Sequence, residues 1–209
     1  MKRHTGIVGV WVALNAMWFA PSLSGQVLRE PVRLVASDGA ADDMFGNSVS
    51  VSGNVAVVGA PYDDDNGSQS GSAYIFRRNG AVWTQEQKLL ASDGAAVDLF
   101  GGSVSVSGDV AVVGASSDND NGGFFSGSAY VFRWNGSTWA EEQKLLPSDG
   151  TRFDHYFGWS VSVSGDVAVV GTLTDDDACP SDPLCGSGSA YVFRWNGSEW
   201  LQEGKLLAW

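Results

Sequence analysis

The chain has 209 residues, a formal net charge of −12 and a hydrophobic content of 44%. This length allows one domain or a part of a larger protein. A surface this acidic disfavours nucleic acids and anionic membranes as partners, because both are bound through clusters of Lys and Arg. It suits solubility, cations or basic partners.

The N-terminus has the pattern of a secretory signal. Lys2 and Arg3 precede an apolar run from Ile7 to Ala20, and the small residues Ser22 and Ser24 follow. The run is shorter than the ~20 residues that a membrane-spanning helix needs. We therefore predict that residues 1–24 are a signal peptide cleaved after Ser24 and that the protein is secreted or held at the cell surface. The alternative is an uncleaved anchor.

Three near-identical units follow this leader. A Phe-Gly dipeptide recurs with spacings of 55 and then 57 residues, and one tyrosine and one tryptophan recur in step with it. Self-similarity at such a period indicates a repeat architecture in which each repeat is one supersecondary unit. The predicted boundaries are 25–36 for the outer strand of an incomplete blade and 37–91, 92–147 and 148–209 for the three repeats.

Each unit contains four stretches with strand character. In the second unit, residues 103–107 alternate as a half-buried strand does, and residues 109–114 are almost continuously apolar, as in a strand covered on both faces. Residues 128–133 are aromatic and β-branched, and residues 138–146 supply a fourth strand. Four antiparallel strands in about 55 residues predict an all-β fold made of three β-propeller blades.

The two ends of the array match each other. Residues 30–39 resemble residues 142–150, so the mature chain opens on an outer strand without the rest of its blade. Three blades are too few for a closed ring, which takes typically about four to eight. The sequence is therefore expected to be a partial or open propeller: a segment of a longer parent chain with further blades, a chain that self-associates, or an open arc with exposed edges.

Most of the length variation between repeats falls in two kinds of loop. In an up-and-down blade, the loop between the second and third strands and the connector between blades lie at the same end. Insertions gathered at one end usually mark the binding face of a repeat protein. The acidic loops therefore predict a binding face, with these candidate residues: Asp63, Asp64, Asp65, Asp118, Asp120, Asp175, Asp176 and Asp177.

Some of these carboxylates have a spacing suited to calcium, which prefers several hard oxygen ligands. The candidate metal ligands are Asp63, Asp65, Asp118 and Asp120. The alternative is that Asp and Asn occupy these loops because they stabilise turns and tolerate the left-handed conformation. No other cofactor is indicated.

Two cysteines, Cys179 and Cys185, flank a short stretch of the longest acidic loop. In an oxidising compartment we expect them to form a disulfide, which would stabilise the fold by about 2 kcal/mol on the loop-entropy model.

The Phe-Gly at 45–46 and the Gly-Ala-Pro at 59–61, repeated with variation in each unit, resemble the FG-GAP repeat family, best known from the β-propellers of integrin α subunits. The resemblance covers Pro31 to the end of the chain and implies a seven-bladed parent fold with a role in extracellular recognition or adhesion. The turn that carries a calcium loop in integrin-type repeats is here only three residues, such as Ser107-Gly108-Asp109. The calcium site of the family therefore does not carry over.

These observations favour an exported, non-enzymatic protein whose acidic loop face binds an extracellular protein or carbohydrate. One alternative is a structural spacer in a larger surface protein. The other is a polysaccharide hydrolase or lyase, for which Asp154, His155 and Tyr156 are acid–base candidates and paired carboxylates stay an open alternative.

Overall fold

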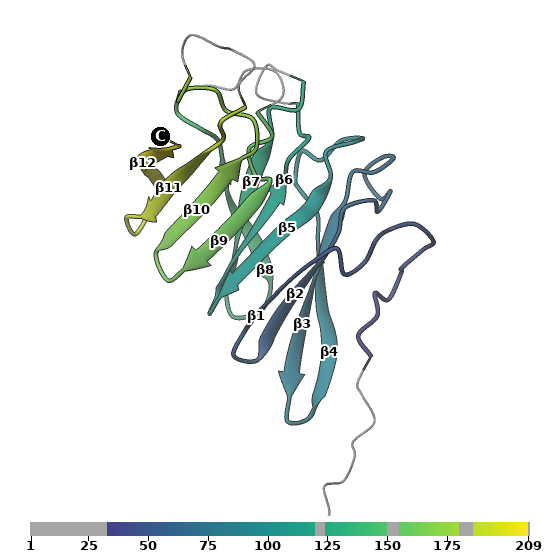
Figure 1. Cartoon of the computed structure of the whole chain (residues 1–209). Helices are drawn as coiled ribbons and strands as arrows, with labels where there is room; N and C mark the ends of the chain where they lie inside the picture. The colour runs from purple at the N-terminus through teal and green to yellow at the C-terminus, as the bar shows by residue number, and fades with distance from the viewer. Residues whose placement is uncertain (1–32, 120–123, 150–154, 180–185, 209) are drawn as a thin grey trace, which may run out of the picture. The chain divides into compact units, whose positions relative to one another are not determined.

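A computed structural model describes residues 33–119, 124–149, 155–179 and 186–208. These residues form twelve β-strands in three separate four-stranded antiparallel sheets (Figure 1), which confirms the predicted all-β fold. No helix long and apolar enough to cross a membrane occurs among them. The predicted signal peptide lies outside the described residues.

Each sheet is a meander in which strands follow one another in chain order. The first sheet contains β1 (Ser48–Ser52), β2 (Val55–Ala60), β3 (Ser72–Asn79) and β4 (Val82–Leu89). The second contains β5 (Phe100–Ser107), β6 (Val110–Ala115), β7 (Ser128–Trp134) and β8 (Trp139–Leu145). The third contains β9 (Ser160–Ser164), β10 (Val167–Thr172), β11 (Ser189–Trp195) and β12 (Trp200–Leu207).

The antiparallel pairing gives each sheet two different ends. The tight turns between the first and second strands, and between the third and fourth, lie at one end, with glycines such as Gly53 (φ 59°) supplying the left-handed backbone. The opposite end, called the loop end below, holds the connectors before β1, β5 and β9 and the loops after β2, β6 and β10. Hydrogen bonds join connector and loop there, from Tyr62 N to Asp43 O and from Ser117 N to Asp98 O. The prediction that these loops share one end is confirmed.

The core lies between sheets rather than within one sheet. Val57 and Ile75 of the first sheet pack in one buried cluster with Phe100, Tyr130 and Phe132 of the second. A second cluster joins the second sheet to the third in the same way. Burying one such side chain contributes about 1.5–3 kcal/mol. A single sheet exposes both of its apolar faces, so each repeat depends on its neighbour for stability.

In the first strand of a sheet, alternate side chains face the sheets on either side. Val104 and Val106 in β5 are 8% and 6% exposed because they face the first sheet. No sheet within the described residues precedes β1, and its Val49 and Val51 are 69% and 66% exposed. The intervening serines point to the following sheet. There Val106 N donates to Ser50 Oγ at 3.0 Å.

The two halves of the repeat motif meet across the gap between sheets. A Cβ built on Gly59, in the Gly-Ala-Pro of the first sheet, would lie 2.0 Å from the carbonyl oxygen of Gly101, in the Phe-Gly of the second. That oxygen accepts a hydrogen bond of 2.7 Å from Ser48 Oγ. Gly101 has φ 89°, a conformation that favours glycine. Gly114 and Gly158 repeat the same contact one sheet further on.

Among the described residues, the sheets do not close into a ring. Leu206 in β12 is 58% exposed, whereas the equivalent Leu89 and Leu145 are each 1% exposed beneath the next sheet. At the position of Gly204 the earlier repeats have glutamine, and Gln143 holds both the backbone N–H and the carbonyl of Trp200 in the following sheet. The outer face of the third sheet is thus exposed, whereas the equivalent faces of the first and second sheets are buried.

The contact between glycines predicts unequal effects for equivalent substitutions. Gly59→Ala or Gly114→Ala should lower the free energy of unfolding by about 3 kcal/mol, because the new methyl group meets a neighbouring backbone carbonyl that cannot move freely. Gly171→Ala should cost less than about 1 kcal/mol, since its methyl group would meet only the rotatable Ser160 hydroxyl at close range. Urea unfolding measures all three, and equal losses would contradict the proposed role of the contact.

Candidate functional site

Each repeat places a tyrosine and a lysine at the centre of its acidic loop. In the first repeat, the Tyr74 hydroxyl lies 2.9 Å from Asp63 Oδ2 and 3.0 Å from Asp38 Oδ1. The Lys88 ammonium contacts the same two carboxylates at 2.8 Å each and Asp65 at 2.6 Å. The carboxylates of the loop after β2 and of the connector before β1 are therefore held together by one ammonium group.

The other two repeats build the same cluster. Lys144 contacts Asp93 at 2.7 Å and Asp118 at 2.8 Å, and the Tyr130 hydroxyl lies 2.8 Å from each of them. In the third repeat the members are Tyr191, Lys205, Asp149, Asp175 and Asp177, with ion pairs of 2.7, 2.6 and 2.5 Å from the lysine to the three carboxylates in turn. The threefold recurrence indicates that the cluster is part of the scaffold that shapes the loop end.

The cluster shifts the pKa of its members in opposite directions. Burial alone would raise the pKa of Asp175, but the hydrogen bonds from Lys205, the Asp177 N–H and Ser189 outweigh it and lower the pKa to about 2. Burial raises the pKa of Tyr74 to about 12. For Lys88, burial acts to lower the pKa, but three hydrogen-bonded carboxylates raise it overall. Near neutral pH Asp175 and Lys88 are therefore charged and Tyr74 is neutral.

The predicted acidic residues thus fall into different environments. Asp63, Asp118 and Asp175 are 3%, 1% and 0% exposed and belong to the clusters. Asp65 and Asp177 are exposed but also contact a lysine. Asp64 is exposed, Asp176 is half-buried, and neither forms an ion pair with another described residue; Asp120 lies outside the described residues. The acidic face that remains for a partner is therefore smaller than the spacing of the aspartates implies.

Three of the four carboxylates predicted as calcium ligands contact an ammonium group, and the fourth, Asp120, lies outside the described residues. Asp63 and Asp65 both contact Lys88, and Asp118 contacts Lys144. Among the described residues no group of three or more His, Cys, Asp or Glu side chains is arranged to hold a metal. The lysine supplies the positive charge that calcium would supply in a metal-binding loop.

Two further sequence predictions concern the third repeat. Cys185 lies outside the described residues, so its disulfide with Cys179 stays a prediction. His155, the acid–base candidate, is 7% exposed, and its Nδ1 has no hydrogen-bond partner within the described parts of the chain. It occupies the position held by Asp43 and Asp98 in the other repeats.

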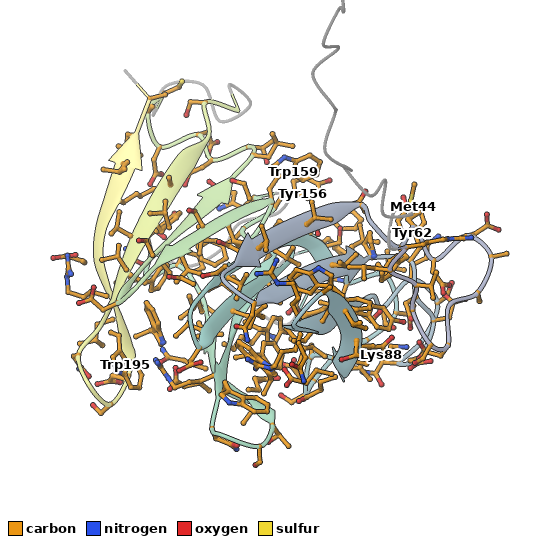
Figure 2. The ribbon with its side chains drawn as sticks, turned by 90° about the horizontal axis from the view of Figure 1, so that it is seen from below. Met44, Tyr62, Lys88, Tyr156, Trp159 and Trp195 are labelled. Carbon is orange, nitrogen blue, oxygen red and sulfur yellow. The ribbon has the colours of Figure 1, made fainter. Side chains whose placement is uncertain are left out.

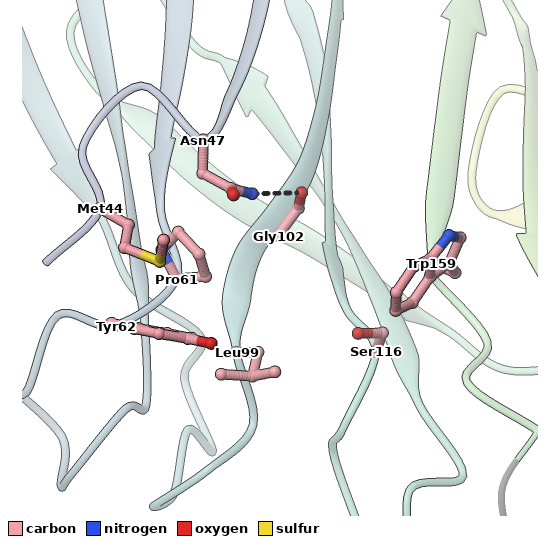
Figure 3. Close-up of a pocket in the computed structure, with 8 residues that line it drawn as sticks. All are labelled: Met44, Asn47, Pro61, Tyr62, Leu99, Gly102, Ser116 and Trp159. Atoms are coloured by element: carbon pink, nitrogen blue, oxygen red, sulfur yellow. Dashed lines mark hydrogen bonds between the residues drawn. The ribbon is translucent and has the colours of Figure 1, made fainter.

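A pocket of about 390 Å³ opens at the loop end beside the first strands of the three sheets. Figure 3 shows residues of all three repeats around it, with the Asn47 amide donating to Gly102 O at 3.1 Å. In Figure 2, Met44 lies beside Tyr62 and Tyr156 beside Trp159, while Trp195 lies away from both pairs. The lining residues are Met44, Asn47, Pro61, Tyr62, Leu99, Gly102, Ser116 and Trp159.

The pocket residues differ between repeats where the scaffold does not. Asn47, Gly102 and Trp159 hold equivalent positions directly after the Phe-Gly, yet share no chemistry. The preceding phenylalanine and glycine and the tyrosine and lysine of the clusters are identical in all three repeats. The sequence prediction of a binding end did not identify these lining residues. A position-by-position comparison of the three repeats gives the signal that finds them.

The backbone at the loop end is also strained. All seven non-glycine residues with positive φ in the described part of the chain lie there, including Met44 (φ 56°), Leu99 (φ 58°) and Tyr156 (φ 53°) at equivalent positions. Non-glycine residues in this conformation cost about 1 kcal/mol or more each and gather at functional sites. At Met44 and Leu99 the strained backbone directs side chains to the pocket.

Sheets of this kind, packed face to face in a repeating array, define a β-propeller repeat protein. The sequence pattern of the FG-GAP repeat matches residues 28–76, 83–132 and 139–193, which is more than half of the chain. The chain therefore belongs to the FG-GAP repeat family, as its repeated motifs predicted. The second and third matched stretches begin in the outer strands β4 and β8, and all three stretches end in the third strand of a sheet, β3, β7 and β11.

Comparison with curated proteins found no match. Among solved structures, the chain is similar to Saccharomyces cerevisiae Sqt1, with 10% identity and a TM-score of 0.47 over 81% of this chain and 36% of that one. It is also similar to the tricorn protease, with 12% identity and a TM-score of 0.36 over 74% of this chain and 12% of that one. The chain thus spans about a third or less of either structure.

The lysine clusters predict a large effect from one substitution. Lys205→Met should lower the free energy of unfolding by about 3 kcal/mol, because it leaves the buried Asp175 without its counter-charge. Millimolar calcium should raise the melting temperature of this variant but not of the wild type, where the ammonium already lies between the carboxylates. Arg194→Met, at an exposed ion pair, should cost less than about 1 kcal/mol. Equal losses in the two variants would contradict this assignment.

The shifted pKa values predict where stability is lost with pH. Asp175, whose pKa is lowered from 3.8 to about 2, should contribute about 2 kcal/mol that is present above pH ~4 and lost as pH falls towards 2. Tyr74, whose pKa is raised from 10.0 to about 12, stabilises the fold below pH ~10 and loses this effect as pH rises towards 12. Urea unfolding from pH 2 to 12 should show both losses, and a Lys205→Met variant should show a smaller acid loss.

Proposed function

We propose that this protein is an exported, non-enzymatic FG-GAP repeat protein that binds an extracellular protein or carbohydrate through its loop end. The observation that carries the proposal is the contrast between repeats. The Phe-Gly dipeptide and the tyrosine and lysine of the clusters are identical in all three, while the positions around the pocket and in the adjacent loops differ in chemistry and length. Repeats that served only as spacers would need no such difference at one end.

The charge of the loop end favours a partner that is basic or neutral. Asp64 and Asp176 remain outside the lysine clusters, in a chain with a net charge of −12. Such charges steer the approach of a basic partner and repel anionic ones. The pocket at the same loop end is concave and mixed in polarity, which is the usual form of a site for a small ligand or a protruding side group.

Export is supported by the N-terminal sequence. Lys2 and Arg3, the apolar run from Ile7 to Ala20 and the small residues at 22 and 24 have the order of a secretory signal. The predicted Cys179–Cys185 disulfide fits an oxidising compartment. Binding without catalysis is supported by the ion pairs of Asp63, Asp118 and Asp175 with lysines, because these carboxylates are buried and already paired.

The experiment is a binding assay on the secreted chain, whose intact mass should show the loss of residues 1–24. The chain is passed over arrays of immobilised glycans and of basic and acidic extracellular proteins. The double variant Asp64→Asn with Asp176→Asn should weaken binding to a basic partner about tenfold and reduce its dependence on salt, because rim charges mainly control association.

The matched control is Asp109→Asn, which removes one carboxylate in the turn between β5 and β6 at the opposite end. It should leave the affinity within about twofold of the wild type. Binding that is lost equally in the control, or no binding to any array, would overturn the proposal.

A further inference from the structure

The pocket at the loop end carries no charge. Its eight lining residues include an amide, two hydroxyl groups, two aromatic rings and several apolar side chains, but no Asp, Glu, Lys, Arg or His. In a chain with 24 acidic residues this is a local exception. A charged ligand buried there would lose its hydration without gaining a counter-charge. The ligand that fits is therefore uncharged.

An exposed indole forms one wall of the pocket. Trp159 is 53% exposed, and its position is Asn47 and Gly102 in the other repeats, so the scaffold does not require an aromatic residue there. Tyr156 meets the Trp159 ring edge to face at 6.3 Å, and itself stacks on Phe125 with an interplanar angle of 11°. These contacts hold Trp159 in place, and the packing between sheets does not account for it.

Polar groups around the pocket complement this ring. The Asn47 amide nitrogen donates to Gly102 O at 3.1 Å, which fixes the amide and leaves its carbonyl oxygen as an acceptor. Tyr62 is 37% exposed and Ser116 contributes a second hydroxyl group. Fixed neutral donors and acceptors beside an aromatic face suit a ligand that has hydroxyl groups on one side and C–H groups on another.

We propose that this pocket binds a neutral saccharide, with one face of a sugar ring packed on Trp159 and its hydroxyl groups bonded to Asn47, Tyr62 and Ser116. The volume of about 390 Å³ lies at the small end of ligand pockets and suits one or two sugar rings rather than a long chain. The proposal rests on the proposed function, of which it names the ligand class.

The test replaces a residue of the third repeat by the residue at the equivalent position of the first repeat. Trp159→Asn gives the third repeat the residue that the first repeat has at this position, so it should fold as the wild type does. The matched control is Leu201→Thr, which replaces a residue that is 48% exposed in β12 by the residue of the first repeat at that position. Melting temperatures of both variants are measured before binding.

The probes are neutral oligosaccharides of glucose, galactose, mannose and N-acetylglucosamine, with sialylated and sulfated glycans as the charged counterparts. We expect the wild type and Leu201→Thr to bind at least one neutral glycan with the same affinity, and Trp159→Asn to bind it at least tenfold more weakly. Binding of only charged glycans, or neutral-glycan binding that is unchanged in Trp159→Asn, would overturn the inference.

The two proposals fail in different ways. If no neutral glycan binds, but a basic protein binds and responds to Asp64→Asn with Asp176→Asn, the saccharide inference is wrong and the proposed function stands. If neither a glycan nor a protein of the arrays binds, both are wrong.

Discussion

The close approach of two glycines from neighbouring sheets is the constraint on which the rest of the structure depends. Gly59 and Gly101 let the backbones meet without a side chain between them, and Ser48 donates to the same Gly101 carbonyl. Gly114 and Gly158 repeat this contact. The family motif thus describes an interface: the Gly-Ala part of one blade contacts the Phe-Gly part of the next. This explains why the motif recurs with the period of the blade.

This contact between glycines determines where the core and the candidate site lie. Because the backbones lie so close, the Phe100 ring can pack between Tyr130 of its own sheet and the apolar face of the preceding one. The same approach places the loops and connectors of adjacent repeats together at one end. There the lysine clusters fix the loops, and the positions between them are free to differ. The pocket residues are among those free positions.

Much of the fold could be predicted from the sequence, because the three repeats can be compared with one another. The strands, their order and the shared loop end follow from periodicity and turn residues. The meaning of the Ser-Val alternation did not follow, since a pattern of period two indicates two faces without showing that the serine face also meets a neighbour through Ser50. A single strand cannot reveal which sheet lies opposite it.

The candidate site was predicted less completely. Spacing along the chain identified the aspartates as a group but not their partners, because β3 and most of β4 lie between Asp63 and Lys88 in the chain. An acidic loop with a lysine at its centre is a structural element, whereas the same loop without it is a candidate calcium site. The pocket residues were missed because each is an ordinary residue in its own repeat. The difference shows only when equivalent positions of the three repeats are compared, as at the position after Phe-Gly, with Asn47, Gly102 and Trp159.

The central claim is that each blade is stable only between its neighbours. The most direct measurement is the thermal unfolding of the isolated second repeat, residues 92–147, followed by circular dichroism and tryptophan fluorescence. Since Val112 and Phe132 would both be exposed to water without the adjacent sheets, the account predicts no cooperative transition. A cooperative transition of the isolated repeat, with native-like fluorescence below it, would contradict the account.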